Sequence, residues 1–399
     1  MKFGFGPYSS ILLVFFFHLV VSGALILKLG LEHRLRSAQW LSLVLVLVAL
    51  YISPFMLGYA GWYGMDGYRE TLFYLPLQQI LFIGPVFLFY LKTLLYPEYS
   101  PSKRDQLHFL PGSLYLLYSL VVFIFDVFLF DQVYFYQDGR DKDFDLWYQI
   151  AGFISMITYF LLSLRLYQRY RRQIFDQLSY AEEVAYNWVR NFLLIFLLIL
   201  ILRALFFIIN PEWGEFGRKF WYYLSISIVG YFLAIRGYRQ SILLSTSLGL
   251  RNLVPEVMPP AIATTDATTR EASESEALSE DHVQLVRRIE QIMHRDHLYQ
   301  NSTLTLSGLA EHLQTTSKNI SQAINKGTGL NFNDYVNRFR IEAFLQEIEA
   351  GTHEQHTLLG IAISCGFNSK STFNRAFKKQ LGLSPNEYVR KHRQGGAKS

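Results

Sequence analysis

Two short polar stretches near the C-terminus carry side chains of the kind that bind nucleic acid. At helical spacing, each stretch gathers amide, hydroxyl and basic side chains on one face, opposite an apolar face. The first set is Lys318, Asn319, Ser321, Gln322 and Asn325, and the second is Lys370, Ser371, Asn374, Arg375, Lys378 and Lys379. In the major groove, Asn and Gln can bond the edge of adenine, and Arg and Lys can bond the edge of guanine. We therefore predict that both stretches bind double-stranded DNA.

The charge of this part of the chain has the right sign for contact with phosphates. Residues 283–399 contain fifteen Lys and Arg against nine Asp and Glu, a balance of +6. In the second stretch we expect Asn374 and Arg375 to read bases, and Lys378 and Lys379 to hold phosphates. Charge alone leaves a second interpretation open, because an exposed polar helix face can also bind a protein partner.

An internal repeat indicates how the two stretches are positioned. Residues 314–336 and 366–389 superpose, with one insertion, at a spacing of 52–53 residues. The matched positions include Ser317-Lys318 with Ser369-Lys370, and Gly329-Leu330 with Gly382-Leu383. Each copy predicts a short helix, a tight turn and a second helix. A long helix predicted over 331–350 joins the units, which could then enter successive major grooves about 34 Å apart.

Caps and apolar positions define the helices of each unit. Serine accepts a backbone N–H at a helix N-terminus, and glycine adopts the left-handed conformation that ends a helix or makes a turn. The predicted cap and turn residues are Ser317, Gly327, Gly329, Gly366, Ser369 and Ser384. The residues predicted to face inward are Ile320, Ala323, Ile324, Phe373, Ala376 and Phe377. A preceding helix over 283–294 is expected to place Val283, Val286, Ile289 and Met293 on one apolar face.

The stretch 304–393 resembles the DNA-binding domain of the AraC/XylS family of bacterial transcription regulators. The resemblance is carried above all by residues 366–389, GFNSKSTFNRAFKKQLGLSPNEYV. It implies two helix-turn-helix units in which the second helix of each reads promoter DNA. It also makes RNA polymerase and a second copy of the chain candidate partners. The first unit departs from the family pattern at Gly327, where a longer helix is expected, and at His312-Leu313-Gln314, which lacks the usual turn glycine.

The N-terminal half is dominated by apolar runs. Hydrophobic residues make up 51% of the 399 residues and charged residues only 17%, and the imbalance is concentrated in residues 1–240. Seven runs are long enough to cross a hydrocarbon core of about 30 Å as helices of about 20 residues. They lie at 8–31, 38–60, 72–95, 107–130, 146–168, 188–210 and 220–237. The first run also resembles a cleaved signal peptide, but its apolar character continues to Leu31.

Basic residues in the loops predict the orientation in the membrane. Twelve Lys and Arg fall on one side of the seven runs and six on the other, and the richer side is expected to be cytoplasmic. The loop 131–145, with its five Asp residues, falls on the outer side. The N-terminus is then outside, and the C-terminal part of the chain lies in the cytoplasm.

Four polar residues within the apolar runs need partners, because polar groups are costly in lipid. They are Gln78, Gln79, Asp126 and Arg203, and the predicted orientation puts all four in the outer half of the bundle. Two interpretations stay open: a ligand pocket accessible from outside, or interhelical contacts that only fix packing. Asp126 is a candidate ion-pair partner for Arg203, although the second interpretation allows that the two never meet.

Residues 251–281 lose all apolar periodicity and are rich in Pro, Ser, Thr and Glu, which is typical of a disordered linker. We place the domains at 1–240, a flexible acidic linker at 241–282, and the DNA-binding domain at 283–399. The chain has one cysteine, Cys365, which excludes an intrachain disulfide and a multi-cysteine metal site. Because no catalytic motif is present either, we expect no enzymatic activity, no cofactor and no metal.

The sequence as a whole predicts an all-α protein, with a seven-transmembrane helix bundle followed by a cytoplasmic tandem helix-turn-helix domain. We expect a multi-pass protein of the bacterial cytoplasmic membrane that receives a small-molecule or envelope signal and binds promoter DNA. Two alternatives stay open. One is a transporter-like or receptor-like protein whose tail binds only protein partners, and the other is a membrane-anchored regulator released when its linker is cut.

Overall fold

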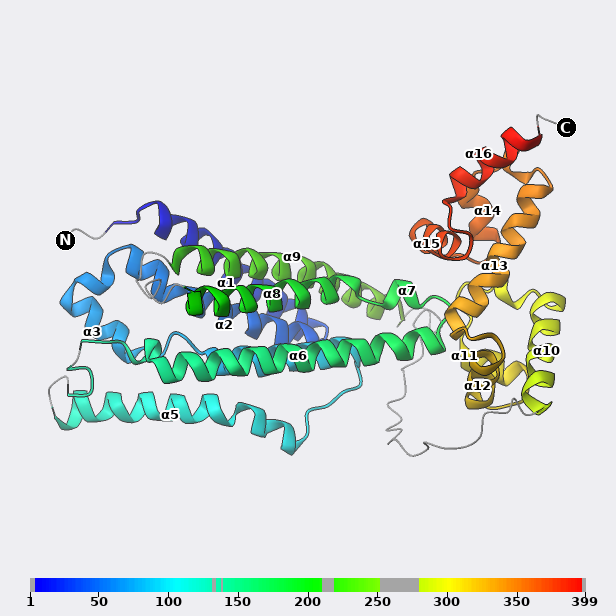
Figure 1. Cartoon of the computed structure of the whole chain (residues 1–399). Coiled ribbons are helices and arrows are strands. Elements are labelled where there is room, and N and C mark those ends of the chain that lie inside the picture. Colours follow the sequence, from blue (N-terminus) through cyan, green and yellow to red (C-terminus); the bar gives the residue numbers. More distant parts are fainter. Residues whose placement is uncertain (1–3, 131–133, 138, 210–218, 252–279, 397–399) are drawn as a thin grey trace. The chain divides into compact units, whose positions relative to one another are not determined.

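The chain folds into helices that divide between two compact units. The computed structural model describes residues 4–130, 134–137, 139–209, 219–251 and 280–396 (Figure 1). Within them, the one strand-like feature is an isolated antiparallel bridge between Leu178 and Thr305. The first unit, here called the apolar unit, comprises residues 1–167 and 187–261, and the second, the C-terminal unit, comprises 168–186 and 262–399. Residues 168–186, which the sequence predicts to belong to the membrane domain, pack instead with the C-terminal part of the chain.

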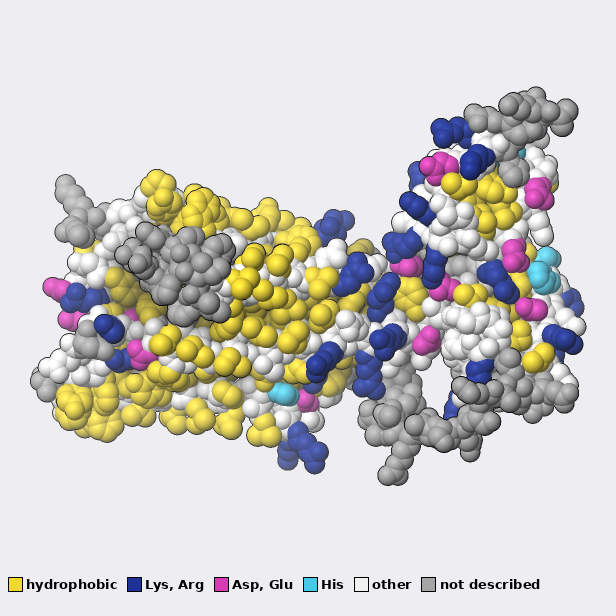
Figure 2. All heavy atoms as spheres, viewed as in Figure 1, with side chains coloured by type: hydrophobic (Ala, Val, Ile, Leu, Met, Phe, Trp, Pro, Cys, Tyr) yellow, Lys and Arg dark blue, Asp and Glu magenta, His cyan; other side chains and the backbone are white. Residues whose placement is uncertain are grey.

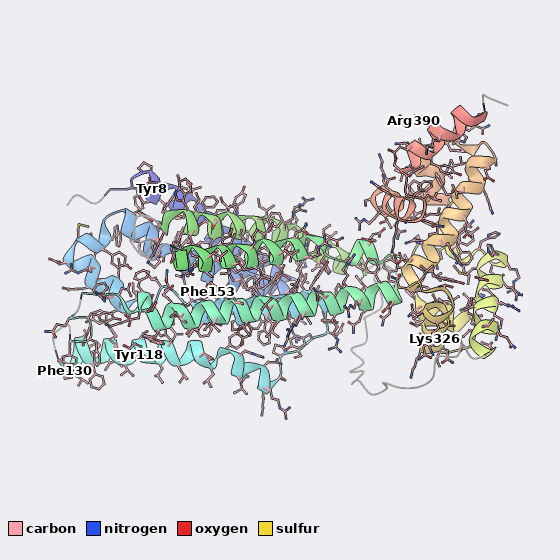
Figure 3. The ribbon with its side chains drawn as sticks, in the orientation of Figure 1. Tyr8, Tyr118, Phe130, Phe153, Lys326 and Arg390 are labelled. Atoms are coloured by element: carbon pink, nitrogen blue, oxygen red, sulfur yellow. The ribbon has the colours of Figure 1, made fainter. Side chains whose placement is uncertain are left out.

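Eight helices of the described residues build the apolar unit or lead out of it. They are α1 (Pro7–Glu32), α2 (Arg36–Tyr59), α3 (Asp66–Tyr74), α4 (Ile80–Leu95), α5 (Leu110–Ile124), α6 (Leu146–Gln177), α8 (Asn187–Ile209) and α9 (Phe220–Arg251). A 3₁₀ segment, Lys103–Phe109, precedes α5, and a π-helical turn, Phe125–Leu129, follows it. Tyr8 and Phe130 lie at the same end of this unit (Figure 3), as an even number of crossings between them requires.

Five helical stretches of the described residues are long and apolar enough to cross a membrane, judged by length and composition. They are Pro7–Glu32, Arg36–Tyr59, Lys103–Leu129, Leu146–Gln177 and Asn187–Leu205. Helix α2 is the most deeply buried of them and packs against α1, α4 and α9. The others present large apolar side chains outward, such as Val14, Leu117 and Leu198, and apolar atoms cover much of the face of this unit seen in Figure 2. Such a surface suits lipid better than water.

The third predicted span, 72–95, is not one helix. Helix α3 ends at Tyr74 and α4 begins at Ile80, because Pro76 disfavours a helical conformation at the preceding residue and has no N–H to donate. In this break the buried backbone N–H of Gln78 has no helical acceptor and instead donates to Asp143 Oδ2 at 2.8 Å. The apolar helix that remains, α4, is 16 residues long.

The seventh predicted span lies within α9, which is not among the five stretches and which continues beyond it. Because α9 ends at Arg251, the first residues of the range assigned to the linker, 241–251, are helical rather than flexible. Of the rest of the predicted linker, residues 252–279 lie outside the described residues, and residues 280–282 belong to helix α10 (Glu280–Arg295). The count of seven spans is thus a prediction, whereas the helical and apolar character of the unit is observed.

The C-terminal unit contains two small helical groups joined by one long helix. Its helices are α7 (Ala181–Val184), α10 (Glu280–Arg295), α11 (Leu306–His312), α12 (Ser317–Thr328), α13 (Phe332–Glu349), α14 (Leu358–Ser364), α15 (Lys370–Leu381) and α16 (Pro385–Gly396). The first apolar core includes Ile320, Ile324 and Phe339, and the second includes Phe344, Phe373 and Phe377. Ala323 is buried and Ala376 packs against the second core, so the predicted inward faces are confirmed. Of the face predicted for α10, Ile289 and Met293 are buried, whereas Val283 is exposed.

Most predicted caps are observed, with two corrections in the first group. Ser369 accepts the N–H of Thr372 at 3.2 Å, and Ser384 forms a reciprocal capping box with Glu387. The N-cap of α12, however, is Thr316 rather than Ser317: its hydroxyl accepts the N–H of Asn319 at 3.2 Å.

Only one of the two glycines predicted to end α12 does so. Gly329 adopts φ of 70° and caps the helix, whereas Gly327 lies inside it. A Cβ on Gly327 would approach Cγ2 of Val286 to 2.8 Å, so this glycine lets α10 pack closely on α12.

The two tight turns use different residues for the same conformation. Gly366 has φ of 98°, and a Cβ there would lie 2.4 Å from the carbonyl oxygen of Tyr299. In the first group the corresponding left-handed residue is Gln314, with φ of 53°. The turn is therefore retained without a glycine, and the cost is the strain of a left-handed conformation at a residue with a Cβ.

Candidate nucleic-acid interface and candidate signal site

Helix α12 presents most of the first predicted set to solvent. Its apolar side is buried through Ile320, Ala323 and Ile324, and that fixes the rotation of the helix. Lys318, Asn319 and Asn325 are exposed, and Ser321 and Gln322 are half-buried. The side chains form only long contacts with one another, such as Asn325 Nδ2 to Ser321 Oγ at 3.5 Å. They are thus placed on one accessible face, as the sequence pattern predicts.

Helix α15 presents the whole second set. Phe373 and Phe377 pack into the second core and Thr372 is buried. The residues left on the outer face, all exposed, are Lys370, Ser371, Asn374, Arg375, Lys378 and Lys379. No acidic residue interrupts this face, so it can approach a polyanion. Each helical group carries a further basic residue, labelled in Figure 3: Lys326 near the end of α12 and Arg390 in α16.

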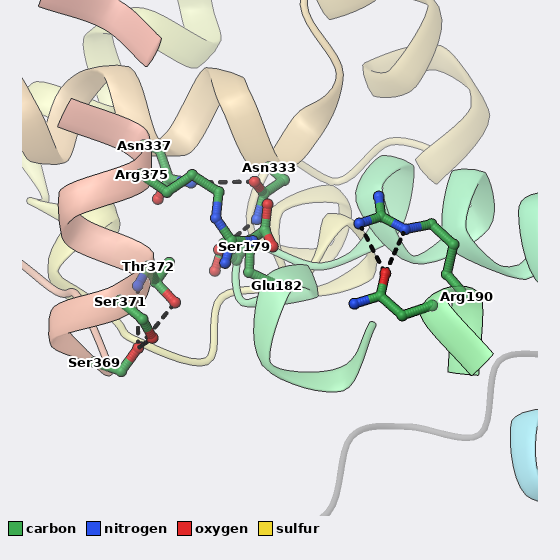
Figure 4. A network of polar contacts seen from close by, with 10 residues as sticks. Ser179, Glu182, Arg190, Asn333, Asn337, Ser369, Ser371, Thr372 and Arg375 are labelled. Carbon is green, nitrogen blue, oxygen red and sulfur yellow. Dashed lines mark hydrogen bonds and ion pairs between the residues drawn. The ribbon is translucent and has the colours of Figure 1, made fainter. Parts of the chain in front are cut away.

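Two cations of this face already have carboxylate partners within the C-terminal unit. Lys379 Nζ lies 2.6 Å from Asp334 Oδ2, near the start of α13. Arg375 Nη1 forms an ion pair with Glu182 of α7 (Figure 4). Lys379 would therefore have to leave Asp334 in order to contact a phosphate. Arg375 would likewise have to leave Glu182 before it could bind a base.

A buried arginine, Arg340 of α13, hydrogen-bonds to three separate segments of the C-terminal unit: the stretch 299–301, its own helix and the stretch before α7. Its guanidinium is 1% exposed and makes five hydrogen bonds. Nε donates to Tyr299 O at 2.8 Å and Nη2 to Asn301 O at 2.9 Å, while Ser179 and Asn337 accept the rest. Burial lowers the pKa of Arg340 to about 10, opposed by the nearby Glu183, so the group stays charged at neutral pH. The sequence gives no local sign of this role, because its partners lie far away along the chain.

Comparison with known proteins agrees with this arrangement of helices. Residues 309–391 match the family model described as a helix-turn-helix domain. The C-terminal unit contains a helix-turn-helix domain. The family model does not extend to the apolar unit, and no solved structure matches the chain.

Several relatives of this domain are named as transcription regulators. An HTH-type transcriptional regulator of Mycobacterium tuberculosis is 31% identical over 80 residues, which are 20% of this chain and 30% of the relative. The transcriptional regulatory protein HptR of Staphylococcus aureus is 31% identical over 87 residues, 22% of this chain and 33% of the relative. An uncharacterised HTH-type regulator of the same species is 27% identical over 101 residues, 25% of this chain and 13% of the relative. The chain thus spans a third or less of the length of these relatives, whose names agree with a non-enzymatic, DNA-binding domain.

In the apolar unit, the structure joins two of the four predicted polar residues in one network. Arg203 of α8 donates to the hydroxyls of Tyr51 at 3.1 Å and Tyr222 at 2.9 Å, and to Gln149 Oε1 at 3.1 Å. Gln149 Nε2 in turn donates to Gln78 Oε1 at 2.7 Å. Through these bonds Arg203 links α8 to α2, α6 and α9.

The other two predicted residues lie outside this network. Gln79 Nε2 donates to Pro76 O within its own turn. Asp126 accepts from the hydroxyl of Tyr74 at 2.9 Å and from the backbone N of Phe135 at 3.1 Å. The candidate ion pair between Asp126 and Arg203 is therefore not formed, because each side chain is held by other partners.

The structure adds polar residues that the sequence did not single out. Asp143, in the predicted outer loop, accepts from Tyr115 at 2.6 Å as well as from the backbone of Gln78. Its neighbour Asp141 accepts from Tyr63 at 3.0 Å, and burial together with the charge of Asp143 raises the pKa of Asp141. The sequence does not indicate the role of Gln149 either, since a single Gln in an apolar run has no distinctive spacing. Asp143 thus connects this loop to α5, through Tyr115, and to the break before α4, through the backbone of Gln78.

We predict that Arg203→Leu changes transcriptional output of the helix-turn-helix domain without changing membrane insertion. The substitution removes three hydrogen bonds that hold four helices together and leaves buried acceptors unpaired. The measurement is expression of a reporter under a bound promoter, normalised to the amount of protein in the membrane. Arg190→Leu is the matched control, because Arg190 lies on the same helix, is exposed and, among the described residues, hydrogen-bonds to its neighbour Asn191 alone. Equal output per molecule in the two variants would assign Arg203 to packing alone.

Proposed function

We propose that this protein is a membrane-bound one-component transcription regulator of the AraC type. In this proposal the apolar unit spans the cytoplasmic membrane of a bacterium and receives a signal, and the helix-turn-helix domain binds promoter DNA. The observation that carries the proposal is the outer face of α15, with six exposed polar or basic side chains and no acidic one, inside the stretch matched by the helix-turn-helix family model. The five long apolar helical stretches support the membrane location.

The chemistry of the two faces indicates how DNA would be held. Asn374 and Arg375 are the base-reading candidates on α15, and Gln322 and Asn325 are those on α12. Lys318, Lys370 and Lys378 would contact phosphates and fix the register without reading sequence. RNA polymerase and a second copy of the chain remain proposed partners, since regulators of this type act at promoters, commonly on paired half-sites.

The proposal is tested by selection of DNA from a random pool with the full-length protein in lipid nanodiscs. Enrichment of one sequence motif, bound more tightly than a scrambled duplex over a range of salt concentrations, is the expected result. Binding of all duplexes alike would contradict sequence-specific regulation. Absence of binding, with protein partners recovered instead, would favour a receptor-like function for the tail.

We predict the topology with the N-terminus outside and the helix-turn-helix domain in the cytoplasm. A reporter that is active only outside the cytoplasm should be inactive when fused after Ser399 and active when inserted after Gly139. The physical reason is the twofold excess of Lys and Arg on the predicted cytoplasmic side. A reporter that is active only inside provides the control, and the reverse pattern at both positions would overturn the whole functional proposal, because DNA lies on one side of the membrane.

A further inference from the structure

The segment that joins α6 to α8 is an integral part of the C-terminal unit. We call residues 178–185 the docked loop. The N–H of Ser179 donates to the carbonyl of Leu304 at 3.1 Å, which forms the isolated bridge next to Thr305. Ser179 and Ala181 are fully buried and Leu178 is nearly so. A loop between two membrane helices would ordinarily be solvated, so this burial is specific to its contacts with the helix-turn-helix domain.

The surface that receives the docked loop is built from buried donors of α13. Asn333 Nδ2 donates to Ser179 O at 2.8 Å and to Leu178 O at 3.3 Å. Arg340 donates from Nη1 to Ser179 O at 3.2 Å and from Nη2 to Ser179 Oγ at 3.0 Å. Both side chains are at most 2% exposed. Without the loop these donors would lose their acceptors, which is costly for buried groups, so the surface is complementary to this segment.

The docked loop also reaches the outer face of α15. Glu182 pairs with Arg375, and its side chain is 13% exposed, against 53% for that of Arg375. Next to it, Asn368 Nδ2 donates to Glu183 Oε2 at 3.3 Å. Figure 4 shows Arg375 pointing from α15 toward Glu182 and Ser179 rather than straight outward. This contact occupies Nη1 of Arg375 and turns the guanidinium toward the carboxylate, so Glu182 competes with a guanine edge for its paired donors.

We propose that the docked loop is an intramolecular ligand of the helix-turn-helix domain, and that it competes with DNA for Arg375 through Glu182. This inference rests on the proposed function. The loop follows α6 directly after Gln177 and leads into α8 at Asn187, so a signal that shifts these two helices relative to each other changes the position of the loop. DNA affinity is lowered by the fraction of molecules in which the loop is docked, and undocking removes that reduction.

The first test compares DNA binding of full-length variants in nanodiscs. Glu182→Ala should bind the selected duplex about twofold to fivefold more tightly than wild type, as expected for loss of one ion pair whose arginine is half-exposed, and a scrambled duplex should gain less because it offers Arg375 no matching base. Glu354→Ala is the matched control, because Glu354 is exposed in the loop before α14 and its loss changes the net charge equally. In an Arg375→Ala background the gain from Glu182→Ala should vanish, since the two residues act through one contact.

The second test measures docking without DNA. Glu183→Cys and Asn368→Cys together place two thiols where a hydrogen bond now joins the side chains, and they leave the Glu182 pair intact. A short thiol-specific cross-linker should connect them in nanodiscs that hold one protein each, and the selected duplex should reduce the yield. The native thiol does not interfere, because Cys365 is buried and burial raises its pKa to about 11. A protease site inserted in the stretch 252–279 makes the cross-link visible as two fragments that stay joined.

The outcomes separate the two ideas. No cross-link, with both thiols reactive toward a simple label, overturns docking. A cross-link together with equal DNA affinity of Glu182→Ala and Glu354→Ala overturns competition for Arg375. A cross-link in a protein that binds no duplex in any variant overturns the proposed function, and with it the inhibitory role of the loop.

Discussion

Replacement of Arg340 by methionine is expected to lower the free energy of unfolding of the C-terminal unit by about 3–5 kcal/mol. Methionine fills a similar volume but donates no hydrogen bond. The acceptors that Arg340 satisfies include the backbone carbonyls of Tyr299, Asn301 and Ser179, which cannot be removed together with the cation. Each buried acceptor left without a donor costs about 1–3 kcal/mol. The loss of stability is therefore larger than for a buried ion pair in which both partners are replaced by apolar groups.

Amide hydrogen exchange of α13 in the full-length protein measures this effect. The expected loss corresponds to exchange faster by about two to four orders of magnitude. Arg338→Met is the control in the same helix, since Arg338 is half-exposed and pairs with Glu290 at 3.4 Å and Glu342 at 3.7 Å. Surface pairs of this kind contribute roughly 0–1 kcal/mol. Arg340→Lys should recover little, because an ammonium lacks the planar fork of donors, and equal exchange in the two methionine variants would refute a structural role for the network.

Arg375→Ala is expected to reduce discrimination between the selected duplex and a scrambled one by about 1–3 kcal/mol, through relaxed preference at one base position. The quantity to measure is the ratio of the two affinities in the full-length protein. Glu182→Ala, measured in the same way, is the complementary variant, because it frees Arg375 without removing it. Arg375 projects from the outer face of α15 and is exposed, so the substitution should leave the fold intact.

Lys378→Ala serves as the comparison for Arg375→Ala. Lys378 is exposed on the same helix face, and as a phosphate contact it should weaken binding to both duplexes equally. The slope of log affinity against log salt concentration should fall in magnitude by roughly 0.9 for one lost phosphate contact. Lys379 is less suitable, because its ion pair with Asp334 would be lost as well. Equal loss for both duplexes in Arg375→Ala would reassign Arg375 to phosphate binding.

The two predictions meet at the docked loop. Ser179 accepts from Arg340, which also donates to the carbonyls of Tyr299 and Asn301. Glu182 pairs with Arg375, which we propose reads DNA. A single short segment between two apolar helices therefore contacts both the structural centre of the domain and its binding face. In our proposal, undocking of this segment is the step that frees Arg375 for DNA.

The sequence by itself determined the helices of the DNA-binding domain and the faces they expose. Apolar residues at steps of three and four settle which side of α12 and α15 is buried, and caps such as Ser369 settle where helices start. These signals are local, so they can be read without coordinates. Where two neighbouring residues could play the same role, the predicted helix end was wrong by one or two residues. Thr316 rather than Ser317 is the N-cap of α12, and Gly327 lies inside this helix, where α10 packs closely against it.

Only the tertiary structure decided which distant segments meet. The partners of Arg203 and Arg340, the carboxylate of Asp143 that satisfies the break before α4, and the contact of Glu182 with Arg375 join residues far apart in the chain. A single polar residue in an apolar run has no periodicity, and its best partner depends on which helices pack together. Asp126 and Arg203 show this directly, since their opposite charges suggested a pair and packing gave each a different set of partners. Helix faces follow from the chain's local chemistry, whereas pairing across the fold follows from packing geometry that no short stretch of sequence contains.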